Sequence, residues 1–188
     1  MEIHKRDYQR PSRTQASIVN ALLRLMRNDV FTALTVKEIT SEAGIARSTF
    51  YLNYRSKEDV LSSYIEELFT QFTQTIPQEE QADSYLLSLH HFRFWAQHLD
   101  TLALLSRHNL FPLLLDKYEA WMAELAQHYP AHHVFGFAVT SSAEEGLLQA
   151  FCAAGLWNLL KHWVHLGARE TPEEMARMYQ RWLSASAT

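Results

Sequence analysis

The sequence contains a single cysteine, Cys152, in 188 residues, so the chain cannot form an internal disulfide. This usage is typical of a reducing compartment, and we expect a cytoplasmic protein. Glycine and proline are scarce, with five of each, which favours long helices over many short strands. No apolar run approaches the roughly 20 residues of a membrane span. Residues 1–13 also lack the apolar stretch of a secretion signal, so we expect a soluble protein with no membrane partner.

Charge is unevenly divided along the chain. Residues 1–57 hold ten lysines and arginines against five acids, whereas residues 58–188 hold seven against sixteen. The head therefore carries +5 and the body −9, within a total of −4. A basic head on an acidic body indicates a polyanion that binds the head only. Chance clustering of charges would give the same pattern, and charge alone does not decide between the two.

Hydrophobic periodicity predicts an all-α fold, because no stretch alternates as a strand would. We expect helices at about 12–27, 35–44, 47–53, 57–75, 82–98, 101–108, 112–129, 135–166 and 172–185. The predicted domains are residues 1–56, in which 1–11 form a polar arm, and residues 57–188. The first domain holds three short helices, and the second completes a total of about nine.

Capping patterns mark the ends of the short helices in the head. Thr35 is three residues before Glu38, and Ser56 is three before Asp59, as in capping boxes. Gly44 suits the turn that ends the second helix. Three short helices, the last two joined by a tight glycine turn, predict a helix-turn-helix unit.

The third helix has the composition of a helix that reads DNA. In "GIARSTFYLNYRSKEDVL", residues 44–61, Ile45 and Phe50 are the expected buried anchors. The side chains left to project are Arg47, Ser48, Thr49 and Tyr51. Arginine can pair with guanine O6 and N7, and the hydroxyl groups and the tyrosine can reach bases or phosphates. Arg47 and Thr49 should read bases with help from Ser48 and Tyr51. Backbone contacts are expected from Thr35, Tyr51, Asn53, Lys57 and the arm residues Lys5, Arg6, Arg10 and Arg13.

The segment "TVKEITSEAGIARSTFYLNYRSKEDVL", residues 35–61, resembles the DNA-binding signature of the TetR/AcrR family of transcriptional regulators. Leu52 and Asn53 depart from that signature, since the family frequently has a basic or polar residue at the first position and a histidine at the second. The resemblance implies a homodimeric regulator, usually a repressor, that binds a palindromic operator and is released by a small effector. It also implies a variable C-terminal domain that binds the effector and dimerises through its last two long helices. The bacterial protein would then be associated with the nucleoid.

Two apolar stripes fit such a dimer interface. They consist of Leu148, Cys152, Gly155, Leu159 and Trp163 in the first helix, and Met175, Met178, Tyr179 and Trp182 in the second. The same stripes would also suit the core of a single subunit. An apolar or aromatic effector could be enclosed by Phe92, Trp95, Phe111, Tyr118 and Trp121, with Arg93, Arg107 and His108 as polar anchors. Ordinary core packing explains the same aromatic residues.

Other classes of function have weaker support. The ten histidines show no spacing typical of a metal site, and Cys152 has no neighbouring base or cation that would activate it. No phosphate loop or nucleophile elbow is present, so we expect no enzyme, no cofactor and no metal. The alternative function is a regulator of TetR fold whose C-terminal domain binds a protein partner, as co-activators or cell-division regulators do.

Overall fold

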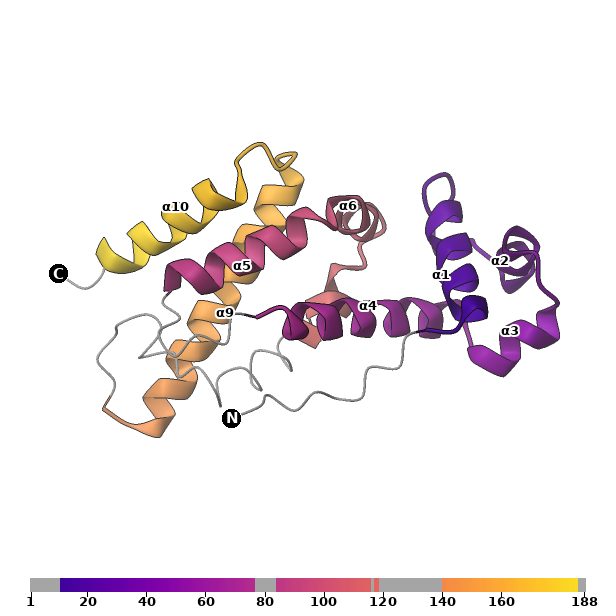
Figure 1. Cartoon of the computed structure of the whole chain (residues 1–188), viewed down its shortest axis with the longest axis horizontal. Coiled ribbons are helices and arrows are strands. Elements are labelled where there is room, and N and C mark those ends of the chain that lie inside the picture. Colours follow the sequence, from indigo (N-terminus) through magenta and orange to yellow (C-terminus); the bar gives the residue numbers. More distant parts are fainter. Residues whose placement is uncertain (1–10, 77–83, 116, 119–139, 186–188) are drawn as a thin grey trace.

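The computed structural model describes residues 11–76, 84–115, 117, 118 and 140–185. Every regular element in these ranges is a helix, which confirms the predicted all-α class (Figure 1). Within the same ranges, no helix is both long enough and apolar enough to cross a bilayer.

The head of the molecule consists of three short helices. These are α1 (Arg13–Leu25), α2 (Val36–Ala43) and α3 (Arg47–Asn53), which gather at one end of the molecule (Figure 1). Their core is formed by side chains from all three helices and from the start of the fourth, including Ile18, Leu22, Ile39, Phe50 and Leu61. Gly44 ends α2 at a φ of 67°, a left-handed conformation that glycine adopts without strain. The predicted helix-turn-helix geometry is therefore present.

A long helix, α4 (Lys57–Gln74), connects the head with the remaining helices (Figure 1). Those are α5 (Ser84–Ala96), α6 (Leu99–Arg107), α9 (Ser142–His165) and α10 (Pro172–Ala185). α10 lies along α5, and both α5 and α6 pack against α9. The apolar core of this part is continuous with that of the head, because one hydrophobic cluster includes side chains of both.

The bounds of one long helix differ from those predicted. Periodicity suggested a helix from 135 to 166, but α9 begins at Ser142, and residues 135–139 lie outside the described residues. Two hydroxyl residues explain the start. The Ser141 hydroxyl accepts the Glu144 amide at 3.2 Å, while the Thr140 amide and hydroxyl donate to the Glu144 carboxylate at 2.7 and 2.6 Å. Of the helix predicted at 112–129, only residues 112–115, 117 and 118 are described.

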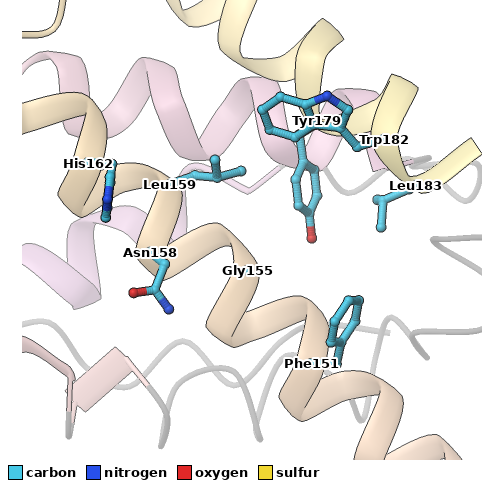
Figure 2. A pocket seen from close by; sticks show the side chains of 8 residues that line it. All are labelled: Phe151, Gly155, Asn158, Leu159, His162, Tyr179, Trp182 and Leu183. Carbon is cyan, nitrogen blue, oxygen red and sulfur yellow. The ribbon is translucent and has the colours of Figure 1, made fainter. Parts of the chain in front are cut away.

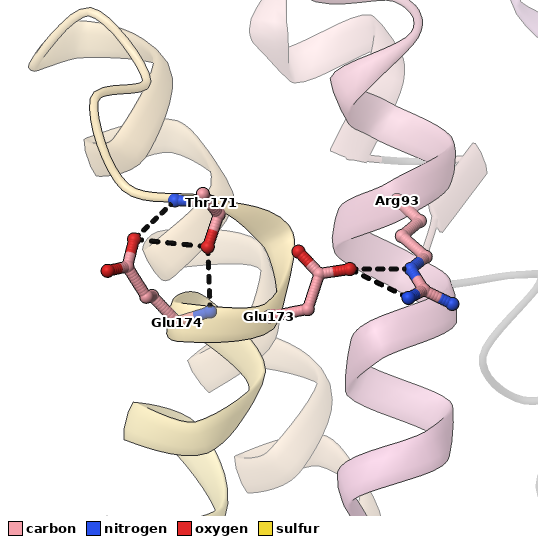
Figure 3. Close-up of polar contacts among 4 residues, drawn as sticks. All are labelled: Arg93, Thr171, Glu173 and Glu174. Atoms are coloured by element: carbon pink, nitrogen blue, oxygen red, sulfur yellow. Dashed lines mark hydrogen bonds and ion pairs between the residues drawn. The ribbon is translucent and has the colours of Figure 1, made fainter.

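Polar contacts fix the junction between α5 and α10 (Figure 3). Arg93 donates from Nε and Nη2 to Glu173 Oε1, at 2.9 and 2.7 Å. Thr171 caps α10 by accepting the Glu174 amide at 3.2 Å, and its own amide donates to the Glu174 carboxylate at 2.7 Å. Arg93 therefore lies at the surface, where it joins two helices, and does not anchor an effector in a cavity.

The interior between α4, α5 and α9 is rich in aromatic side chains, and one of its histidines is fully enclosed. His91 is 2% exposed and lies beside Phe72 and Tyr118, with ring centroids 5.9 and 5.8 Å away. Burial, with a smaller effect of neighbouring His90, lowers the pKa of His91 from 6.5 to about 3. His91 is therefore neutral in the folded protein.

The depressed pKa of His91 predicts a loss of stability in acid. The unfolded chain takes up a proton below pH 6.5, whereas the folded chain does so only near pH 3. The free energy of unfolding should therefore fall through that window by up to about 1.4 kcal/mol per pH unit from this group. Urea unfolding should show a shallower pH dependence for His91→Leu than for the original protein. At pH 7.5 the two differ by packing alone, and equal slopes below pH 6 would contradict the assignment.

Candidate nucleic-acid interface

The start of α2 is fixed by the predicted capping box. The Thr35 hydroxyl accepts the Glu38 amide at 3.3 Å, and the Thr35 amide donates to the Glu38 carboxylate at 2.8 Å. These bonds from Thr35 lower the pKa of Glu38, so the carboxylate stays charged. At the other end of α2, the Ile45 amide donates to the Thr40 carbonyl at 3.0 Å across the Gly44 turn. The angle at which α3 leaves α2 is thereby fixed.

One face of α3 is anchored in the core of the head. Phe50 is fully buried, and the neighbouring Tyr54 is 5% exposed, with ring centroids 6.2 Å apart. Ile45 is half-buried against the same core, as the sequence predicted. Because a helix turns about 100° per residue, burial of Phe50 leaves the opposite face directed outward.

The outward face carries most of the predicted base-reading residues. Arg47, Ser48 and Tyr51 are exposed, while Thr49 is half-buried. The side chains of Arg47 and Ser48 make no hydrogen bond within the part of the chain that the structure describes, so their donors are available to a ligand. Arg13, at the start of α1, is also exposed, whereas Lys5, Arg6 and Arg10 lie outside the described residues.

Two residues that were predicted to contact the DNA backbone make side-chain hydrogen bonds within the head. The Thr35 hydroxyl donates to the Glu38 carboxylate at 2.7 Å, and the Asn53 amide nitrogen donates to the Thr49 carbonyl at 2.8 Å. The Thr35 hydroxyl has no second proton to donate to a phosphate while this bond holds, whereas the Asn53 amide keeps one further N–H. Both residues therefore shape the helices that present the exposed face.

The sequence predicts that Lys57 contacts a DNA phosphate, whereas in the structure its ammonium group is bound by the protein itself. Its ammonium group donates to the carbonyl oxygens of Phe31, Thr32 and Leu34, at 2.7, 2.9 and 2.7 Å. It also lies 5.0 Å from the centre of the Phe31 ring, within the range of a cation–π contact. An ammonium group has three donors, and all three are used here. Lys57 thus fastens the start of α4 to the loop between α1 and α2.

The end of α6 holds the same loop from the other side. His108 donates from Nε2 to the Met26 carbonyl at 2.8 Å, and its Nδ1 accepts the Phe31 amide at 3.5 Å. Arg107 donates to the Arg27 carbonyl at 3.0 Å. Arg107 and His108 therefore join the head to the rest of the chain, and the suggestion that they anchor an effector in a cavity is not supported.

A groove of about 640 Å³ separates parts of α9 and α10 (Figure 2). It is lined by Phe151, Gly155, Asn158, Leu159, His162, Tyr179, Trp182 and Leu183. Phe151 is 66% exposed and Trp182 is 48% exposed, so large aromatic side chains face solvent here. The groove lies on the helices predicted to form the dimer interface.

The predicted interface residues divide between the groove and the interior of the subunit, and Gly155, Leu159, Tyr179 and Trp182 are the ones that line the groove. Cys152, Trp163 and Met175 are buried inside the chain, and Tyr179 is 5% exposed while its hydroxyl donates to the Cys152 carbonyl at 3.2 Å. Leu148, Leu159 and Met178 are half-buried. Exposed residues beside the predicted ones in α9 are Leu147, Phe151, Asn158 and His162. Each directly precedes a predicted residue, so its side chain points about 100° away from that residue around the helix.

The predicted effector residues belong to the interior. Phe92 and Trp95 are fully buried, and Tyr118 and Phe111 are 1% and 8% exposed. Phe111 and Tyr118 both contact the Trp157 ring, at centroid distances of 5.5 and 5.3 Å, and Trp121 lies outside the described residues. No described group of histidine, cysteine or acidic side chains could hold a metal.

Comparisons with known proteins agree with this geometry. Residues 18–64 match the family model for bacterial regulatory proteins, tetR family. The uncharacterized HTH-type transcriptional regulator YerO of Bacillus subtilis (strain 168) is 43% identical over 49 residues, or 26% of this chain. The match spans only 17% of that relative's length.

Two solved structures are similar over almost the whole chain. A TetR transcriptional regulator from Streptococcus agalactiae 2603V has a TM-score of 0.68 at 23% identity, covering 90% of this chain and 93% of that one. The fatty acid degradation regulator FadR from Bacillus halodurans has a TM-score of 0.66 at 19% identity, covering 93% and 96%. The matched segment and the arrangement of α1, α2 and α3 define an N-terminal helix-turn-helix domain. Residues 18–64 are thus similar to the helix-turn-helix segment of tetR-family regulatory proteins, and the chain as a whole has the TetR-like fold.

The contacts of Lys57 predict a structural effect of its removal. Lys57→Ala should lower the free energy of unfolding by about 2–3 kcal/mol, because three carbonyls lose a charged donor. Arg47→Ala is the matched control, since it removes an exposed cation from the same domain and should change stability by less than about 0.5 kcal/mol. Chemical denaturation of both variants measures the difference. Equal stability of the two variants would show that the Lys57 contacts are not significant.

Proposed function

We propose that this protein regulates transcription by binding a palindromic operator as a homodimer, with residues 46–53 of each subunit in the major groove. The observation that carries the proposal is the exposed face of α3 in a domain of the TetR family. Arg47 and Ser48 are available there, and Tyr51 and Thr49 lie beside them. Arg47 and Thr49 would read bases, Ser48 and Tyr51 would assist, and Arg13 with Arg10 would hold the backbone.

The surface of α9 and α10 supports the homodimer. Leu147 and Phe151 are 73% and 66% exposed, and with Trp182 they place large apolar side chains on adjoining helices. A methyl group added at Gly155 would meet only the Tyr179 ring, at an ordinary 3.8 Å, so the subunit itself does not require a glycine there. Close approach of a second helix does favour one. Two copies of these helices would form a four-helix bundle.

Regulation by a small effector fits the interior of the C-terminal part. Trp95 Nε1 and His91 Nε2 are buried and have no hydrogen-bond partner among the described residues, and native proteins seldom leave such groups unpaired. An apolar or aromatic effector with an acceptor atom would satisfy the tryptophan. It would shift the protein between DNA-binding states only through its different affinities for them. Release of the operator by such a ligand would make the protein a repressor.

A route for this coupling runs through the end of α6. Phe111 packs on Trp157 of α9, and three residues earlier His108 holds the loop between α1 and α2. A displacement of α6 would therefore act directly on the head.

One observation favours a C-terminal domain that binds a protein partner in place of a small effector. Phe69, Phe72, Trp95 and Tyr118 pack on one another with ring centroids 5.6 to 6.3 Å apart, so aromatic side chains fill this part of the interior. A regulator that binds a protein partner through its exposed α9 and α10 surface would need no internal cavity. This is the second candidate function.

Selection of bound duplexes from a random pool tests the DNA-binding proposal. The purified protein should enrich a palindromic motif, with affinity that falls steeply as salt rises. Arg47→Ala should lose about 1–3 kcal/mol of binding free energy and tolerate other bases at one position of each half-site. A folded, dimeric protein that enriches no motif would contradict the proposal and favour the partner-binding alternative.

The dimer is tested by a charge placed in the groove. Phe151→Asp should convert the dimer into monomers, because a carboxylate at this position would be desolvated on association. Analytical ultracentrifugation measures the change, and binding to the full palindrome should weaken at least tenfold. Leu166→Asp is the matched control, since Leu166 is 60% exposed but lies outside the groove. Dissociation of both variants, or of neither, would contradict the assignment of this surface.

A further inference from the structure

Leu52 is the most exposed large apolar side chain in the part of the chain that the structure describes. It is 85% exposed and belongs to the second turn of α3. Its neighbour Tyr51 is 52% exposed, whereas Phe50 is fully buried. A single exposed leucine is ordinary on a protein surface. The position of this one on α3 is what distinguishes it.

Helix geometry places Leu52 at the centre of the outward face. With Phe50 taken as the inward direction, successive residues rotate by about 100°. Ser48 then points about 160° away from the core direction and Leu52 about 200°, on either side of the point opposite Phe50. Arg47 and Tyr51 lie nearer the edge of that face, at about 60° and 100°. Any surface that approaches α3 from outside meets Ser48 and Leu52 first.

The chemistry of the major groove limits what an apolar side chain can contact there. Phosphates and the base edges present charges, donors and acceptors, none of which a leucine can satisfy. The exception is the C5 methyl group of thymine, which is apolar and projects into the major groove. Ser48 lies one helical turn before Leu52 on the same face, so the two side chains would meet neighbouring base pairs.

We propose that Leu52 packs against the C5 methyl group of a thymine in each half-site and so helps to determine the operator sequence. The inference rests on the proposed function, because it requires α3 in the major groove. It adds a base preference that hydrogen bonds alone do not supply. The polar side chains would select their bases by hydrogen bonds, and Leu52 would select thymine by removing its methyl group from water.

Deoxyuridine tests this contact, because it pairs like thymine and lacks only the methyl group. The probe is the duplex selected by the protein, remade with deoxyuridine at one thymine of each half-site in turn. Loss of one buried methyl group should weaken binding by about fourfold per half-site. The original protein should show this loss at one thymine position. Leu52→Ala should bind the duplex with thymine at that position and the duplex with deoxyuridine there with equal affinity.

Two further variants separate the contact from other causes. Val30→Ala removes a side chain that is 61% exposed in the same domain but outside α3, and it should keep the full response to deoxyuridine. Leu52→Lys distinguishes a base contact from a phosphate contact. A lysine facing a phosphate would strengthen binding to all sequences at low salt, whereas a lysine facing a methyl group should weaken it. Thermal unfolding should show that Leu52→Ala is as stable as the original protein.

The outcomes distinguish the two proposals. If the original protein binds a palindrome but no deoxyuridine substitution weakens its binding, only the role proposed for Leu52 is overturned. A selected half-site without thymine, an equal response in Leu52→Ala, or stronger binding by Leu52→Lys does the same. A protein that selects no motif overturns the proposed function together with this inference.

Discussion

The contact on which the helix-turn-helix head most depends is the one between the Lys57 ammonium and three carbonyl oxygens of the loop between α1 and α2. Those carbonyls belong to residues 31, 32 and 34, where the chain forms no regular ladder. A single charged donor group satisfies all three and also lies over the Phe31 ring. Because Lys57 begins α4, the same contact joins this long connecting helix to the loop that leads into α2.

The loop is also held by His108 and Arg107 from the end of α6. The head and the C-terminal helices therefore meet at one short segment, in addition to their shared core. A change in the position of α6 would reach the loop that leads into α2 through these hydrogen bonds. This arrangement gives the proposed regulation a physical basis, since the geometry of two heads on DNA is sensitive to small rotations.

Local chemistry made much of the head predictable from the sequence. Thr35 with Glu38, Ser56 and Gly44 act within a few residues of themselves, so their caps and turn appear in the sequence as spacing. Long-range contacts were not predictable in this way. The partners of Lys57 lie more than 20 residues away, and nothing near Lys57 distinguishes a group that binds carbonyls from one that binds phosphate. The start of α9 was predicted wrongly because the helix was extended along the apolar period, past the N-cap that Ser141 forms with the Glu144 amide.

The proposed dimer surface shows a second limit. In α9 the inner and outer stripes both begin with large apolar or sulfur-containing side chains, Leu148 and Cys152 against Leu147 and Phe151, and they differ by one position, about 100° of rotation. Periodicity establishes that a helix has an apolar face, but the choice between two such faces depends on tertiary packing, here that of Trp163 on Phe92 at 5.7 Å.

Methylation interference on the selected duplex tests the central claim most directly, because it reports which groove the protein enters. The account predicts interference by methyl groups on guanine N7 in two adjacent major-groove segments, on one face of the DNA and about one helical turn apart. The strongest of these positions should lose its effect with Arg47→Ala. Interference confined to adenine N3 in the minor groove, or to one segment only, would contradict the placement of α3 and the palindromic dimer.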